Sequence, residues 1–144
     1  MKTSAQGLSL LHGREGLRLQ AYQDTKGIWT IGYGHTGPEV GPGLTWTREQ
    51  CEEAFVKDLA WCEKTINLYC VQALNQNQFD ALVSFIYNIG QNAFIKSTML
   101  RKLNQGDFEG AAAQFDRWNI PKEIIPRRMG EKAQYLGKAF LARI

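Results

Sequence analysis

The stretch REGLRLQAYQDTKGIWTIGYGHT (residues 14–36) decides how this chain folds. It combines short alternating apolar and polar segments with a DTKG turn and several glycines, a pattern typical of short antiparallel strands. The segments on both sides of it repeat apolar residues about every 3.6 positions, as amphipathic helices do. The sequence therefore predicts an α+β fold in which a β-rich excursion interrupts a helical protein.

Length and composition indicate one globular domain. The chain has 144 residues, of which 44% are hydrophobic, and a formal charge of +3. Such a chain can bury a real core, and its charge favours polyanionic partners only mildly. We expect a single domain, with a β-rich lobe over about 17–46 and a helical lobe that joins 1–16 to about 47–144. A cleft between the lobes would be lined by the quoted stretch.

Several helix starts can be predicted from capping residues. Thr3 and Gln6 have capping-box spacing before a first helix over about 4–12, and Thr47 and Gln50 have it before a helix of about twenty residues. Asn75 is a candidate N-cap for a strongly apolar central helix. Helices are also expected after Ser97, after Asp107 and from about Pro126. The predicted apolar faces of the second, third and last helices comprise Cys51, Phe55, Leu59, Cys62, Ile66, Phe79, Leu82, Val83, Ile86, Ile89, Met129, Ala133, Leu136 and Phe140.

The cysteines and the N-terminus predict a cytoplasmic product. Cys51, Cys62 and Cys70 are an odd number, and the first two would stand roughly 16 Å apart on one helix, too far for a disulfide. We expect all three to be free thiols. No N-terminal segment has an apolar run long enough for a signal peptide, and no stretch approaches the length of a membrane span.

Three polar residues of the quoted stretch can support acid and base chemistry. Glu15 would end the first helix and face the helical lobe, where apolar surroundings favour a neutral carboxyl that can donate a proton. Asp24 lies beside a turn whose solvent and backbone donors favour its anion. Thr30 follows across that turn and would share a water with Asp24. Taken singly, each residue has an ordinary explanation: a solvated helix end, a turn former and a strand threonine.

The spacing Glu, eight residues, Asp, five residues, Thr resembles the catalytic signature of the phage lysozymes, glycoside hydrolase family 24, of the lambdoid-phage type. The similarity continues in LNQNQFDALVSFIYNIG, in STMLRKLNQGDFEGAAAQFDRW and in the PRR near the C-terminus. It therefore covers nearly the whole chain. The resemblance implies a lysozyme-like fold with an active-site cleft between the two lobes.

The resemblance also implies roles for individual residues. Glu15 matches the general acid, Asp24 the carboxylate that positions the attacking water or supports positive charge at the sugar, and Thr30 the water-holding hydroxyl. Asn88 resembles a substrate-binding position. An arginine that pairs with the acid and closes the cleft matches Arg127 or Arg128, with Arg128 preferred.

Two further residues are candidates for the cleft. Tyr33 would either stack on a sugar or belong to the core of the β-rich lobe. His35 would either modulate the site near neutral pH or make a structural hydrogen bond, and the second reading is favoured.

As a member of this family the chain would be an endolysin, a muramidase that hydrolyses the β-1,4 bond between N-acetylmuramic acid and N-acetylglucosamine in bacterial peptidoglycan, with inversion. It would be a monomer that needs no cofactor, metal or nucleic acid. It would accumulate in the host cytoplasm until a holin lets it reach the periplasm and wall. The alternatives are a lytic transglycosylase, a zinc amidase built on His12, His35 and a cysteine, and a wall-binding or nucleic-acid-binding module without catalysis.

Overall fold

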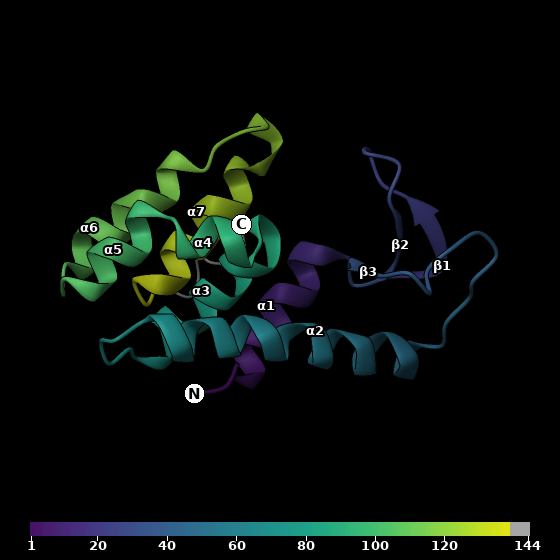
Figure 1. Cartoon of the computed structure of the whole chain (residues 1–144), viewed down its shortest axis with the longest axis horizontal. Helices are drawn as coiled ribbons and strands as arrows, with labels where there is room; N and C mark the ends of the chain where they lie inside the picture. Colours follow the sequence, from purple (N-terminus) through teal and green to yellow (C-terminus); the bar gives the residue numbers. More distant parts are fainter. Residues whose placement is uncertain (139–144) are drawn as a thin grey trace.

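The computed structural model describes residues 1–138 and contains two lobes (Figure 1). A small three-stranded sheet lies at one end and a group of helices at the other. The α+β, lysozyme-like class expected from the sequence is confirmed. The elements are α1 (Ala5–Glu15), β1 (Arg18–Gln23), β2 (Trp29–Gly32), β3 (His35–Thr36), α2 (Arg48–Tyr69), α3 (Gln76–Ile89), α4 (Gln91–Ile95), α5 (Thr98–Asn104), α6 (Phe108–Gln114), the 3-10 turns η1 (Phe115–Arg117) and η2 (Lys122–Ile124), and α7 (Ile125–Tyr135).

The sheet is an antiparallel meander in the order β1-β2-β3. Tyr22 lies opposite Thr30 in the first pair, and Thr30 lies opposite Thr36 in the second, so Thr30 sits on the central strand. Its pairing partners leave it only 4% exposed. The sheet is too small to be stable alone and relies on the helix that follows it.

Helix α2 connects the two lobes. Figure 1 shows it running from beneath the strands to the far side of the helical group. Its 22 residues give a length of about 33 Å at the usual helical rise. The predicted capping box is confirmed, since Thr47 Oγ1 accepts from the Gln50 amide and the Gln50 side chain accepts from the Thr47 amide. The predicted stripe from Cys51 to Ile66 is fully buried, so one face of α2 forms the base of both lobes.

Helix α3 lies at the centre of the core. Asn75 is its N-cap and Gly90 follows its last turn, both as predicted. Eight consecutive residues from Phe79 to Ile86 are buried, so the helix is surrounded on all sides. Phe85 packs edge-on against the rings of Phe94, Phe115 and Trp118. The buried cysteines belong to this core, and the three cysteines of the chain are free thiols.

The structure corrects the ends of the helical lobe. Ser4, not Thr3, caps α1, accepting from the Gly7 amide. Thr3 instead donates its amide and hydroxyl to Glu63, which uses up the side chain that the capping box required. The predicted stripe of the last helix is wrong at Met129, which is 51% exposed, because α7 turns its charged residues inward there.

The rest of that stripe divides into three cases. Ala133 is buried as predicted, and Leu136 is 46% exposed because the helix ends at Tyr135. Phe140 lies outside the described residues. Within residues 1–138, no helix combines the length and the apolar composition needed to cross a membrane.

Candidate active site

Glu15 is the last residue of α1, where the chain leaves the helical lobe for the sheet. Its side chain is only 14% exposed, and Arg127 Nη1 donates to its Oε2 at 2.5 Å. The neutral apolar setting expected for Glu15 is therefore wrong, because a guanidinium lies against the carboxylate. A charge-assisted bond of this kind is among the stronger hydrogen bonds in proteins.

Arg127, rather than the preferred Arg128, pairs with Glu15. Neighbouring helical residues point about 100° apart, so the two arginines of α7 face different elements. Arg127 also donates Nη2 to the Ser84 carbonyl at 3.0 Å and Nε to Glu131 at 3.1 Å. Burial alone would lower the pKa of Arg127, but Glu131 and Glu15 outweigh it and raise the pKa above its usual value. The guanidinium is therefore a fixed cation.

The turn between β2 and β3 closes over the other oxygen of Glu15. Gly34 has φ +83°, and a Cβ at this position would stand 2.9 Å from Glu15 Oε1. The turn is tied to α3, since the Tyr87 hydroxyl donates to the Tyr33 carbonyl at 2.6 Å. The sheet, α1, α3 and α7 thus meet around one carboxylate.

Asp24 organises the turn between β1 and β2. Its Oδ1 accepts from the amides of Lys26 at 2.8 Å and Ile28 at 2.9 Å, the arrangement of an Asx turn. Oδ2 accepts no hydrogen bond from any residue between 1 and 138. The aspartate therefore has one oxygen committed to the turn and one available to a ligand.

Thr30 is joined to Asp24 through Ile28. The Thr30 hydroxyl donates to the Ile28 carbonyl at 3.0 Å, while the Ile28 amide donates to Asp24. A hydroxyl has one proton, so Thr30 Oγ1 can only accept from a further molecule while this bond stands. The structure thus places Asp24 on the β1–β2 turn, Thr30 on the strand that follows it, and Glu15 at the end of α1.

A cavity of about 330 Å³ lies between the Asp24 turn and the helical lobe. Asn88 ends α3 at this cavity, and its Oδ1 accepts from Arg128 Nη2. Arg128 also donates to the Trp118 carbonyl at 3.1 Å and to Glu131 at 2.5 Å. Two of the four predicted substrate contacts, Asn88 and Arg128, therefore line one cavity. The lining residues are Lys26, Asn88, Ile89, Trp118, Ile120, Pro121, Ile124 and Arg128.

Tyr33 is placed in the core rather than in the cleft. It is 7% exposed, its ring stacks on His12 at 4.5 Å between centroids, and its hydroxyl donates to Glu52 at 3.0 Å. With one face stacked on His12 and Phe55 tilted against it at 4.9 Å between centroids, the ring is not free to stack on a sugar. Its prediction as a substrate contact is corrected.

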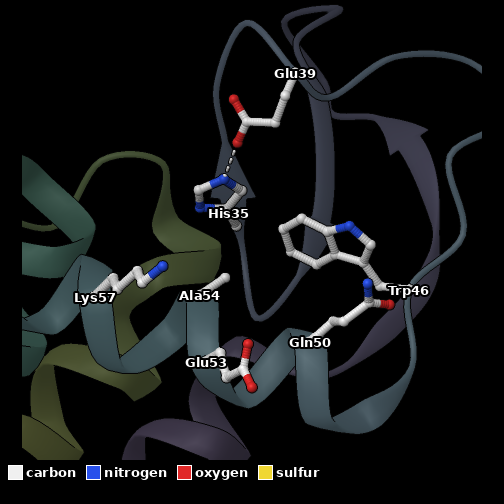
Figure 2. Close-up of a pocket in the computed structure, with 7 residues that line it drawn as sticks. All are labelled: His35, Glu39, Trp46, Gln50, Glu53, Ala54 and Lys57. Carbon is white, nitrogen blue, oxygen red and sulfur yellow. Dashed lines mark hydrogen bonds and ion pairs between the residues drawn. The ribbon is translucent and has the colours of Figure 1, made fainter.

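His35 is locked between two carboxylates. Its Nδ1 lies 2.7 Å from Asp58 and its Nε2 2.6 Å from Glu39. Burial alone would lower the pKa of His35, but the hydrogen bonds to Glu39 and Asp58 outweigh it and raise the pKa. Figure 2 shows the imidazole at the wall of a second pocket, of about 270 Å³, with Trp46 beside it and Lys57 across it. The favoured structural reading fits this geometry.

Sequence reasoning missed Ser84 and Glu131. Glu131 stands four residues after Arg127 and three after Arg128, the spacing at which helical side chains meet, and this was the signal available. Within residues 1–138, no group of three or more His, Cys, Asp and Glu side chains is arranged to hold a metal ion. His12 and His35 make separate contacts, with Tyr33 and with Asp58 and Glu39.

This fold belongs to the lysozyme class. A long helix joins a helical lobe to a small β lobe, and the two lobes meet at a carboxylate. Residues 12–131 match the family model described as Phage lysozyme, and the chain belongs to this family.

Three similar proteins illustrate the relationship. An endolysin of Salmonella phage P22 is 44% identical over 94% of this chain and 99% of its own length. The muramidase domain of SpmX from Asticaccaulis excentricus has a TM-score of 0.87 and 39% identity, covering 94% of this chain and 97% of that one. An endolysin from Escherichia coli O157:H7 phage FAHEc1 has a TM-score of 0.88 and 35% identity, covering 96% and 95%.

The close approach of Gly34 to Glu15 can be tested against a matched glycine. Gly106 has φ +77° and open space where a Cβ would stand. Gly106→Ala should lower the free energy of unfolding only by the cost of backbone strain, about 1 to 2 kcal/mol. Gly34→Ala should lose more, because the methyl group also pushes Glu15 off Arg127. Chemical denaturation measures both, and equal losses would show that Glu15 turns aside without cost.

The contacts of His35 with Asp58 and Glu39 predict that the stability of the protein depends on pH. Because the pKa of His35 is raised in the folded protein, its stabilising contribution is complete below the unfolded value of about 6.5 and is lost as pH rises through the raised folded value. The difference in unfolding free energy between the native chain and His35→Gln should therefore shrink between about pH 6 and pH 9. Denaturation series across this range measure it, and a difference independent of pH contradicts a charged His35 at these contacts.

Proposed function

We propose that this protein is an endolysin that hydrolyses the β-1,4 bond between N-acetylmuramic acid and N-acetylglucosamine in bacterial peptidoglycan. The observation that carries the proposal is the placement of two carboxylates, Glu15 held by Arg127 at the end of α1 and Asp24 on the turn that precedes Thr30. Glycoside hydrolysis needs two carboxyl groups that flank the bond. The identity to a phage endolysin supports the same activity.

Glu15 is the proposed general acid. Its carboxyl group would donate a proton to the leaving glycosidic oxygen as the bond to the anomeric carbon breaks.

Asp24 and Thr30 are the proposed water-holding pair. A water molecule could donate one hydrogen to Asp24 Oδ2 and the other to Thr30 Oγ1, because a carboxylate oxygen and a hydroxyl that already donates to Ile28 can both accept. Its lone pair then points away from the turn. Attack on the anomeric carbon, with transfer of a water proton to Asp24, would give an inverted product.

Asn88 and Arg128 are the proposed substrate-binding residues. They share a wall of the 330 Å³ cavity, opposite Lys26 of the Asp24 turn. Amide and guanidinium groups suit the hydroxyl, acetamido and carboxyl groups of peptidoglycan. Release by a holin and action as a monomer at the cell wall belong to the same proposal, and the charge of +3 suits an anionic wall.

A lysis assay with Glu15→Gln tests the proposal. The amide keeps the size of the side chain but cannot donate the catalytic proton, so lysis should fall by about 10²-fold to 10⁴-fold with the fold retained. Asp116→Asn changes an exposed carboxylate paired with Lys132 and should lyse like the native protein. Full lysis by folded Glu15→Gln would favour a non-catalytic wall-binding module. An anhydro-muramic terminus in digests, seen by mass spectrometry, would favour a lytic transglycosylase.

The inverting course has a separate test. Proton NMR of a fresh digest should show the α-anomer of the new reducing end first, followed by mutarotation. Asp24→Asn keeps an oxygen to accept the turn hydrogen bonds but removes the charge, and it should slow this product while leaving the turn intact. If the β-anomer forms first, the water-holding role of Asp24 and Thr30 is wrong.

A further inference from the structure

Glu131 is a completely buried carboxylate behind the proposed acid. Its exposure is 0%, and it lies on the inner face of α7. Oε2 accepts from Ser84 Oγ at 2.6 Å and from Arg127 Nε at 3.1 Å, and Oε1 accepts from Arg128 Nη1 at 2.5 Å. A buried anion is retained only where its partners are well placed, and here it has three.

Within residues 1–138, three arginines and two glutamates form the charge cluster around Glu131: Arg14, Arg127, Arg128, Glu15 and Glu131 itself. Arg14 donates to Ser84 Oγ at 3.1 Å and to Gln134 at 2.8 Å. Burial lowers the pKa of Arg14 to about 10, and Glu131 acts against that shift. Arg14 therefore belongs to the same charge cluster as Glu131.

Arg127 is the residue that joins the two carboxylates. Its Nη1 donates to Glu15 and its Nε to Glu131, so the two anions compete for one guanidinium. The remaining nitrogen of the guanidinium, Nη2, donates to the Ser84 carbonyl. Any change in the charge of Glu131 therefore reaches Glu15 through a group that cannot move away.

We propose that Glu131 is a positioning residue for the proposed acid. It fixes the guanidinium of Arg127 against Glu15 and shares its charge, so that Arg127 holds Glu15 in place. Through Arg128 it also fixes Asn88 at the cavity wall. This inference rests on the proposed function, because it assigns Glu131 a role in the same reaction.

The other charged groups near Glu15 do not replace Glu131. Cys62 of α2 and Tyr87 of α3 lie close enough to sense the Glu15 charge, and burial raises the pKa of both above their usual values, so both stay neutral. Asp58 of α2 acts on the same two groups and is held by His35. Glu131 is thus the carboxylate that shares Arg127 with Glu15.

The pH dependence of lysis tests this inference. Glu131→Gln removes one anion, so the charge of Arg127 acts on Glu15 alone. The alkaline limb of the pH–activity profile should move down by about one unit, and activity at neutral pH should fall about tenfold or more. In an Arg127→Gln background the same substitution should move the limb far less, because the shared cation is gone.

A conservative variant tests the charge of Glu131 separately from the length of its side chain. Glu131→Asp keeps the anion but shortens the side chain, so it should leave the alkaline limb in place while lowering kcat. Asp80→Asn is the control, since Asp80 of α3 is 2% exposed and accepts from Ser4 and Gln76 but from no arginine within residues 1–138. Its partner Ser4 caps the start of α1, about 16 Å along that helix from Glu15. This variant should lose stability and keep the native pH profile.

The outcomes divide clearly. If the alkaline limb of the pH–activity profile of Glu131→Gln is native and lysis still depends on Glu15, the inference is wrong and the proposed function stands. The same shift in Asp80→Asn would reduce Glu131 to a structural residue. If Glu131→Gln does not fold, Glu131→Asp decides alone, and native kcat and a native profile in that variant overturn the inference. Lysis independent of Glu15 overturns the proposed function itself.

Discussion

The ion pair between Arg127 and Glu15 is the interaction on which the site depends. It joins residues 112 positions apart, from the end of α1 to the beginning of α7, and it does so next to the turn that begins β3. The helical lobe would pack without it, since the aromatic cluster around Phe85 is independent of these charges. The Glu15 carboxylate, however, would lose its fixed partner beside the β2–β3 turn, which Tyr87 ties to α3.

A buried ionic cluster costs stability that an apolar core of the same size would not. Removing two charges from water is unfavourable, and the attraction between them returns this cost only when the remaining donors and acceptors are satisfied. Here Ser84 supplies a hydroxyl and a carbonyl to the cluster, so α3 completes it from the far side. The cost is consistent with a need for a fixed geometry at the junction rather than with stability alone.

The fold could be predicted from local signals, and the site only in part. The caps at Thr47 and Asn75 and the stripe along α2 follow from rules that act within one helix. Asp24 and Thr30 could be placed on one turn because they are near in sequence. The choice between Arg127 and Arg128 could not be made, because it depends on how far α7 is rotated against α3. Glu131 reads as an ordinary helical charge until that rotation is known.

The reactivity of the two buried cysteines of α2 can report local opening of the protein. Both belong to the large core, but Cys51 lies under Gly32 of the sheet and Cys62 lies further along the helix. Burial raises the pKa of both thiols, so each stays unreactive while its surroundings are closed. The speed at which a thiol reagent modifies each one then gives the frequency with which that region opens. The modification rates of Cys51 and Cys62 would therefore report separately on opening near the sheet and opening within the helical lobe.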